Sequence, residues 1–426
     1  MKHIKQNNMS NKEILVNLAI NSRNAYLQLS NINTIHKNNA LITASKYIKQ
    51  HQEAILNANK QDIEFAKSKN HNTAFIDRLT LNKERIEGMC NTLIAVSELD
   101  DPVGKITYQA TRPNGLTITR KTIPLGVIGI IYEARPNVTA DSWALCIKSG
   151  NAAILRPGSE SYNTSKKIME ILQQATIDAK LPQDSIAILP SSDRELVDIM
   201  LELDEYIDVI VPRGGKNLIT AVSNKSKIPV FKHLDGNCHT YIHQDADLDK
   251  AINILHNAKL RRPGICGATE SVVIDQQILP QIIPLIEKKF APLNCEIRAD
   301  KTACSYSNYF KLATEQDFYT EYLDKVFSIK TVSGLDEAIA HINQYSSKHT
   351  EAIITENETA KENFLALVDS AIVMHNTSTQ FADGGEFGLG AEIGISTGRM
   401  HARGPVGLEQ LVTYKYLVQS NGEIRN

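Results

Sequence analysis

Apolar and polar positions follow two different rhythms along this chain, and the change of rhythm divides it. Residues 11–99 carry apolar side chains at helical spacing and predict a series of amphipathic helices, which Pro102 and Gly104 bring to an end. Two apolar stripes have this spacing: Ile14, Leu15, Leu18 and Ala19, and then Ile55, Ile63, Phe65 and Ala66.

The middle of the chain contains short apolar runs separated by amphipathic stretches. This pattern predicts buried parallel strands alternating with helices, and hence an α/β fold. Expected strands lie at 127–131, 152–155, 186–189, 207–211 and 229–231, with helices at 165–179 and 194–203. A second series starts near Thr240 and continues at 271–274, 326–330 and 352–355. Two parallel sheets are therefore expected.

Two further segments alternate like exposed or pairing strands. Residues 116–120 follow a Pro-Asn-Gly turn and are rich in β-branched side chains, and residues 411–418 alternate near the C-terminus. Both predict strands outside the two parallel sheets.

Composition narrows the class of protein without naming a chemistry. The 426 residues are 42% hydrophobic with a net charge of −2, which is typical of a globular enzyme and gives no general attraction to nucleic acid or anionic membranes. Six scattered cysteines without a CxxC pair favour reduced thiols in a cytoplasmic protein. Residues 1–11 are polar, no apolar signal region follows them, and no run predicts a membrane span.

One cysteine stands in a loop suited to a nucleophile. Cys266 follows Arg261, Arg262, Pro263 and Gly264, and precedes an apolar run. Cationic neighbours favour the thiolate, whereas a cysteine buried for packing needs none, so the loop predicts acyl or aldehyde chemistry. The alternative from the loop alone is an ordinary core cysteine.

Polar residues follow the expected strands of the middle region. The segments 132–138, 156–160 and 212–217 combine arginines with Pro, Gly or Asn, and residues at strand ends line ligand clefts in parallel sheets. Arg156, Ser159 and the run Arg213-Gly214-Gly215 could hold a nucleotide phosphate at helix N-termini, although no GxGxxG fingerprint is present. Each segment could also be a plain turn.

Two other segments invite a functional interpretation. Residues 233–239 contain His, Asp, Cys and His, but alternation along a strand would separate their side chains, so no metal site is predicted. The Gly-rich stretch 383–392 and the following 401–405, with Arg403, predict a loop that binds a phosphate or carboxylate; a connecting loop is the alternative.

Taken together, these motifs resemble the gamma-glutamyl phosphate reductase family, a divergent branch of the aldehyde dehydrogenase superfamily. The resemblance rests on strings spread over nearly the whole chain, above all Tyr-Glu-Ala-Arg-Pro-Asn-Val at 132–138, the segment 257–266 with Cys266, and His-Ala-Arg-Gly-Pro at 401–405.

The resemblance implies an aldehyde-dehydrogenase-like fold with β arms. Residues 1–105 and 124–232 would form an NADP-binding domain and 233–374 a catalytic domain. The Gly-rich active-site loop and return segment would span 375–404, and 106–123 with 405–426 would form oligomerisation strands of a dimer or tetramer.

The resemblance also implies the reaction. The Cys266 thiolate would attack gamma-glutamyl phosphate, expel phosphate and hold a thioester that NADPH reduces to glutamate-5-semialdehyde, a step of proline biosynthesis. Functional coupling to glutamate 5-kinase is a further expectation. The Glu that serves as base in aldehyde-oxidising relatives is replaced by His233, which suits a reductive enzyme because hydrolysis of the thioester would waste the substrate.

Roles for individual residues follow from the same resemblance. The Cys266 backbone N–H and the Asn137 side chain are the oxyanion candidates, while spacing places Glu133 at the superfamily's asparagine position. Arg135, Arg262 and Arg403 are expected to bind the substrate's phosphate or carboxylate. The expected cofactor-binding residues are Arg156, Ser159, Arg213, Gly214, Gly215 and Glu321. A hydroxyl at Ser159, where NAD-preferring relatives carry Glu, leaves room for the 2′-phosphate of NADPH.

Three positions depart from the family pattern: Gly267 stands in place of the usual Asn, Arg261 in place of Gln, and Pro157 in place of Gly. Two other functions therefore remain open. One is a cysteine-dependent aldehyde or acyl-CoA dehydrogenase of another substrate; the other is a catalytically lapsed relative that acts as a binding partner.

Overall fold

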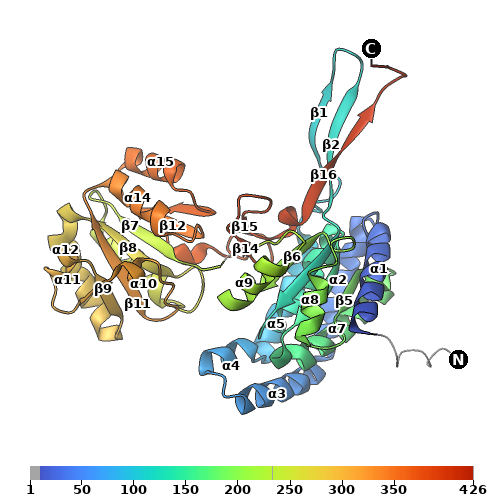
Figure 1. Ribbon diagram of the computed structural model, residues 1–426, viewed down its shortest axis with the longest axis horizontal. Helices are drawn as coiled ribbons and strands as arrows, with labels where there is room; N and C mark the ends of the chain where they lie inside the picture. The colour runs from blue at the N-terminus through green and yellow to red at the C-terminus, as the bar shows by residue number, and fades with distance from the viewer. Residues whose placement is uncertain (1–9, 233, 426) are drawn as a thin grey trace. The chain divides into compact units, whose positions relative to one another are not determined.

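The computed structural model describes residues 10–232 and 234–425, which form two compact units (Figure 1). The first unit comprises the described residues up to Lys232, with Gly388–Gly394 and the described part of Val406–Asn426. The second comprises residues 234–387 together with Ile395–Pro405. Each contains a parallel sheet covered by helices, which confirms the predicted fold class.

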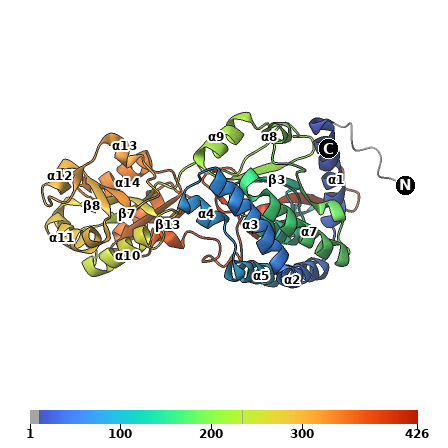
Figure 2. The same ribbon diagram turned by 90° about the horizontal axis from the view of Figure 1, so that it is seen from below.

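The first unit begins with five helices, as the apolar spacing predicts. A capping box between Ser10 and Glu13 starts the first helix, and its buried positions include Leu15 and Ala19, four residues apart. The second and third helices lie beside α7 of the same unit, and the fifth lies beside the second (Figure 2). The bounds are α1 Asn11–Leu29, α2 Thr34–Gln50, α3 Gln52–Ser68, α4 Thr73–Leu79 and α5 Lys83–Glu98.

A four-stranded parallel sheet forms the core of the first unit, in the order β5-β4-β3-β6. One face packs against α1, α8 and α9 through an apolar cluster that includes Leu15, Val127 and Val222. The other face meets α6 and α7. The bounds are β3 Val127–Tyr132, α6 Val138–Ser149, β4 Ala152–Pro157, α7 Tyr162–Asp178, β5 Ile186–Ile188, α8 Arg194–Met200, β6 Val209–Arg213 and α9 Lys216–Lys225.

A separate antiparallel sheet of three strands extends from the first unit (Figure 1). Its order is β1-β2-β16, with bounds Ile106–Thr111, Thr117–Pro124 and Val412–Gln419. After Val412 every position of β16 is exposed. The strands predicted at 116–120 and 411–418 therefore pair with each other, Thr117 opposite Gln419 and Pro124 opposite Val412.

The second unit has a seven-stranded parallel sheet in the order β10-β9-β11-β8-β7-β12-β13. Helices α10 and α11 cover the face that carries Ile242 and Val272, and α14 and α15 cover the face that carries Tyr241 and Val273. Neighbouring residues of one strand thus point into different cores. The bounds are β7 Cys238–Ile242, α10 Leu248–Leu260, β8 Thr269–Asp275, α11 Leu279–Phe290, β9 Glu296–Ala299, α12 Lys301–Cys304, β10 Lys311–Leu312, α13 Glu315–Phe318, β11 Val326–Val332, α14 Leu335–Tyr345, β12 Thr350–Ile354, α15 Glu358–Leu367 and β13 Ile372–His375.

The structure corrects several details of the sequence prediction. Residues 229–231 form only one isolated bridge, Ile210 to Val230, because the chain runs beside β6 for one pair. Phe65 is 41% exposed, since α3 turns the polar Asn59 and Asp62 inward instead. The loop predicted over 375–404 is not one piece: 388–394 belongs to the first unit and 395–405 to the second.

None of the helices within residues 10–232 and 234–425 is long and apolar enough to cross a membrane.

Candidate active site

Cys266 lies in the loop 261–268 that joins α10 to β8. The helix ends at Leu260, Pro263 and Gly264 follow, and the Ala268 N–H donates to the Ile265 carbonyl in a turn at 3.0 Å. Cys90, Cys146, Cys238 and Cys295 are buried, whereas Cys266 and Cys304 are partly exposed. The alternative of a sealed core cysteine therefore does not describe Cys266.

The backbone of Cys266 packs closely against the segment before β7. A Cβ added to Gly236 would come within 2.6 Å of the Cys266 Cα and 2.7 Å of its Cβ. The Cys238 Sγ–H donates to the Cys266 carbonyl at 3.1 Å. Only glycine allows this approach at position 236, so the segment fixes the backbone of Cys266.

The opposite side of the loop meets the short turn Thr379–Phe381. A Cβ at Gly267 would lie 3.2 Å from the Thr379 carbonyl oxygen, and the Gln380 Nε2–H donates to the Ala258 carbonyl at 2.8 Å. The Arg261 guanidinium donates to the Gln380 Oε1 at 3.4 Å. Close packing at Gly267 gives a physical reason for a residue without a side chain there.

The segment considered for metal binding serves the packing of β7 instead. Cys238 bonds to Cys266, while the His239 ring faces the Glu351 carboxylate at 2.9 Å and is fully buried with it. His233 lies outside the described residues. Within those residues, no group of three or more His, Cys, Asp or Glu side chains is arranged to hold a metal.

Gly236 and Cys266, together with Asp369, lie at the amino ends of strands of the second unit. Gly236 precedes β7, Cys266 precedes β8 and Asp369 precedes β13, and the order β8-β7-β12-β13 puts them along one edge of the sheet. Three strand spacings amount to about 14 Å between backbone positions. Asp369, before β13, is therefore farther along this edge from Cys266 than the residues of the Cys266 loop.

The predicted substrate-binding arginines have different surroundings. Arg262 is exposed in the Cys266 loop, and Arg135 is exposed in the turn between β3 and α6 of the first unit. The Arg403 Nη2 lies 3.0 Å from Asp369, which also binds Lys348 and Arg399. These three cations hold the pKa of Asp369 well below its usual range, Lys348 contributing most. Arg262 is thus the better placed of Arg262 and Arg403 for an acyl group on Cys266.

In the first unit, the predicted cofactor residues gather at the carboxyl ends of the strands. Arg156 pairs in register with Ile131, and Arg213 with Tyr132, so both flank the end of the central strand β3. The Arg156 Nη2 donates to the Ser192 carbonyl at 2.6 Å, and burial lowers its pKa. Ser159 is exposed beyond β4.

The Gly214-Gly215 turn is occupied by a carboxylate. The Gly215 N–H donates to the Glu133 Oε2 at 2.9 Å, and a Cβ at Gly214 would lie 2.6 Å from the same atom. The Arg213 Nη2 lies 3.9 Å from Glu392. Glu133 therefore caps α9 where the sequence predicts a phosphate.

Asn137 and Glu321 also have defined neighbours. The Asn137 Nδ2 donates to Asp141 at 2.9 Å, one turn along α6, and burial raises the pKa of Asp141 to about 6. Glu321 lies in the second unit before β11, where its charge helps to raise the pKa of the buried Glu270. The second amide hydrogen of Asn137 is left for another acceptor.

The sequence interpretation missed two pairs of residues. One is Glu133 with the α9 turn, and the other is the buried ion pair of Lys259 and Glu270. A signal for the second pair exists in the sequence: Lys259 falls four residues after Leu255 on the apolar side of its helix, and Glu270 stands in the apolar run of β8. Opposite charges at inward positions indicate a buried pair.

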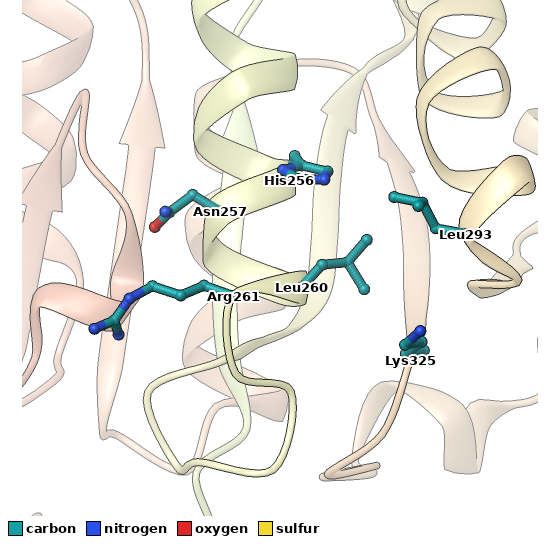
Figure 3. Close-up of a pocket in the computed structure, with 6 residues that line it drawn as sticks. All are labelled: His256, Asn257, Leu260, Arg261, Leu293 and Lys325. Carbon is teal, nitrogen blue, oxygen red and sulfur yellow. The ribbon is translucent and has the colours of Figure 1, made fainter. Parts of the chain in front are cut away.

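A shallow hollow of about 250 Å³ lies beside the base of the Cys266 loop in the second unit (Figure 3). His256, Asn257 and Leu260 line it from α10, with Leu293 and Lys325 across from them. The Arg261 side chain extends away from Leu293 and Lys325 (Figure 3). The hollow contains none of the residues predicted to bind substrate or cofactor.

Comparisons with known proteins agree on one family. Residues 2–304 match the model of the aldehyde dehydrogenase family. A gamma-glutamyl phosphate reductase of Erythrobacter litoralis is 50% identical over 404 residues, covering 95% of this chain and 96% of the relative.

Solved structures give the same result. The gamma-glutamyl phosphate reductase of Thermotoga maritima superposes with a TM-score of 0.94 at 40% identity, over 97% of this chain and all of that chain. An engineered glycolyl-CoA reductase with bound NADP+ shares the fold at 14% identity and a TM-score of 0.67, over 95% of this chain and 97% of that chain.

Proposed function

The chain belongs to the aldehyde dehydrogenase family, in its gamma-glutamyl phosphate reductase branch, and we propose that it reduces gamma-glutamyl phosphate through a thioester on Cys266. The products are glutamate-5-semialdehyde and inorganic phosphate, so the enzyme is an oxidoreductase of proline biosynthesis. The observation that carries the role of Cys266 is its partial exposure on a loop whose backbone is packed on two sides.

The covalent chemistry takes place at one sulfur atom. The Cys266 thiolate attacks the acyl carbon, a C–S bond forms, and the bond from that carbon to the phosphate oxygen breaks. Phosphate is a good leaving group, so no general acid is needed to protonate it as it departs. When bound, NADPH supplies the hydride that the reduction needs. Cys266 then releases the aldehyde as the C–S bond of the thiohemiacetal breaks.

Charge that develops on the acyl oxygen requires hydrogen-bond donors already in place. The Cys266 backbone N–H is one, and the free amide hydrogen of Asn137 is the second candidate. Arg262 is proposed for the phosphate that leaves, because it shares the loop of Cys266. Arg135 and Arg403 are proposed for the remaining anionic groups of the substrate.

A nicotinamide cofactor is expected at the carboxyl edge of the first unit's sheet. The residues there fit an anionic ligand, because the buried Nε atoms of Arg156 and Arg213 have no hydrogen-bond partner. Exposed Ser159 leaves space for the 2′-phosphate of NADPH, and Glu321 of the second unit is proposed for a ribose. The Glu133 carboxylate at Gly215 argues that the cofactor phosphates lie nearer Arg156 than the α9 turn.

The three-stranded arm is proposed to assemble a homodimer or tetramer. Both of its edge strands are unpaired in the described chain, and Tyr414, Tyr416 and Val418 are more than half exposed on β16. Free thiols throughout suit a cytoplasmic enzyme. Coupling to glutamate 5-kinase is proposed because the acyl phosphate substrate is itself reactive.

The reaction is tested in reverse with glutamate-5-semialdehyde, inorganic phosphate and NADP. We expect NADPH formation that depends on phosphate in the wild type and in Cys304→Ala, and its loss in Cys266→Ala. Cys304 is the matched control because it is the other partly exposed cysteine.

The same assay separates the alternatives. Formation of NADPH without phosphate would indicate a cysteine-dependent aldehyde dehydrogenase that passes the acyl group to water. Absence of turnover in the wild type would indicate a lapsed relative, and turnover in Cys266→Ala would remove the thioester from the account.

A further inference from the structure

We propose that Lys259 and Glu270 are positioning residues, whose buried ion pair closes the base of the Cys266 loop and sets where the nucleophile stands. The inference rests on the proposed role of Cys266 and extends it to two residues that touch neither substrate nor cofactor. Lys259 is in the last turn of α10, and Glu270 is the second residue of β8, so they stand on either side of the loop 261–268.

Both side chains are completely buried, and the Lys259 Nζ lies 2.5 Å from the Glu270 Oε2. A pair of charges without solvent contact is held at short range, because separating them would leave each one unpaired in a medium of low polarity. The two ends of the loop are thereby joined by a side-chain contact in addition to the backbone.

The second oxygen of Glu270 extends the contact to a neighbouring turn. Its Oε1 accepts the Leu323 N–H at 3.3 Å, and Leu323 has a left-handed backbone with φ of 54°. A Cβ at Gly264, within the loop, would lie 3.7 Å from the Leu323 carbonyl oxygen. The Glu270 carboxylate thus contacts both Lys259 at the base of the Cys266 loop and the Leu323 turn, which packs against the middle of the loop.

The direction of the neighbouring helix α10 explains why Cys266 needs positioning residues. Cys266 follows the C-terminus of α10 and precedes a strand, so neither element that flanks its loop directs a helix N-terminus at its thiolate. Precise placement relative to the acyl carbon must come from packing and side-chain contacts. Burial raises the pKa of Glu270 to about 7, against the opposing effect of Lys259, so the charge on Glu270 depends on its partner.

The test compares a double replacement with a matched one. Lys259→Met with Glu270→Gln removes both charges, keeps similar volumes and leaves no buried charge unpaired. The control is Lys250→Met with Glu356→Gln, which removes an ion pair of 2.6 Å at the other end of the same helix, at the surface. Glu270→Gln alone retains an acceptor for Leu323 but leaves the buried Lys259 ammonium without its counter-charge, so it tests the pair more severely than the double variant.

Two readouts separate positioning from general stability. The first is the separation of kcat from KM, for which we expect kcat to fall about 100-fold, as for a nucleophile displaced by an ångström. The second is the pH profile of alkylation of Cys266 by iodoacetamide, measured by peptide mass spectrometry with Cys304 as the internal reference. Glu270→Gln should shift both readouts in the same direction and by at least as much, because it leaves Lys259 unpaired.

The inference holds if both readouts change for Cys266, Cys304 is unaffected, and the control variant matches the wild type. The inference is overturned if the double variant has the kcat of the wild type and an unchanged alkylation profile at Cys266. It is also overturned if Cys266 and Cys304 change equally, because that would indicate a general loosening of the structure. If Cys266→Ala were active, the proposed function would fail first. If Cys266→Ala is inactive but the variants of Lys259 and Glu270 have wild-type activity, only the positioning role is rejected and the proposed function stands.

Discussion

The two parallel sheets present their candidate functional residues at opposite ends of their strands. In the first unit, Arg156 and Arg213 are at the carboxyl ends of β4 and β6, just before the next helices begin. In the second unit, Gly236 and Cys266 precede the amino ends of β7 and β8.

This difference determines how each region can hold its ligand. At the carboxyl edge of a parallel sheet the next helices begin, and the backbone N–H groups at their N-termini bind anions. The phosphates of a cofactor therefore suit this edge. At the amino edge, the chain arrives from helix C-termini, which favour cations instead. A thiolate there depends on the arginines of its own loop and on the close backbone packing around Cys266.

The largest effect is expected at Gly236. In Gly236→Ala the new Cβ would overlap the Cys266 backbone, displace the nucleophile and lower kcat/KM about 100-fold. Overpacking should also reduce the free energy of unfolding by about 1–3 kcal/mol. Steady-state kinetics and urea unfolding measure both.

Gly264→Ala is the matched control, because its Cβ would meet only the Leu323 carbonyl at an ordinary 3.7 Å. Equal losses in Gly236→Ala and Gly264→Ala would show that the close approach to Cys266 is not what matters.

The second unit should also be the more acid-sensitive of the two. Burial lowers the pKa of His341 to about 3, with the neighbouring His239 and Lys330 acting in the same direction. His341 is neutral in the folded protein, whereas in the unfolded chain it takes up a proton below its pKa of 6.5. Protonation therefore favours the unfolded chain, and the free energy of unfolding falls as the pH drops below 6.5. Between pH 7 and pH 5 the loss is about 2 kcal/mol.

His341→Phe should remove that pH dependence, since Phe retains the ring contacts with Phe318 and Tyr345. Hydrogen exchange of β12 and α14 peptides at pH 7 and 5 measures it. His51→Gln, at an exposed position of the first unit, is the control. An unchanged pH dependence in His341→Phe would contradict the assignment.

The preference for NADPH over NADH should depend on residues at the carboxyl edge of the first unit's sheet. Ser159→Glu places a carboxylate where the 2′-phosphate is proposed, so the ratio of kcat/KM for NADPH to that for NADH should fall about 10-fold or more. Ser159→Ala, which adds no charge, should change it little. A preserved preference in Ser159→Glu would place the 2′-phosphate elsewhere.

The smallest expected effect concerns Glu133. Glu133→Gln removes a negative charge from the α9 turn and should lower KM for NADPH by a few-fold, because a like charge no longer opposes the phosphates. Alkylation of Cys266 should not change. A raised KM would instead indicate that Glu133 binds the cofactor directly.

The sequence predicts the architecture well where periodicity and burial agree. Leu15 and Ala19 mark α1, and the apolar runs of β3, β4 and β8 are wholly buried. It fails at 229–231, where a short apolar run forms one bridge, because pairing depends on the neighbouring strand rather than on local composition.

The candidate site was predictable in part for a similar reason. Cys266 was recognisable from Pro263, Gly264 and the family strings around them. The contact of Glu133 with Gly215 joins residues 82 positions apart, and no local pattern encodes it. Likewise, Arg403 could be named, but its sharing of Asp369 with Lys348 and Arg399 requires the folded chain.

The central claim is that Cys266 carries the glutamyl group, and trapping that adduct tests it most directly. The enzyme is mixed with gamma-glutamyl phosphate generated in place by a glutamate kinase and ATP, without NADPH, and is quenched in acid for peptide mass spectrometry. The account predicts one glutamyl group on the Cys266 peptide, none on Cys304, and its loss when NADPH is added before quenching. An unmodified Cys266 peptide in enzyme that turns over normally would contradict it.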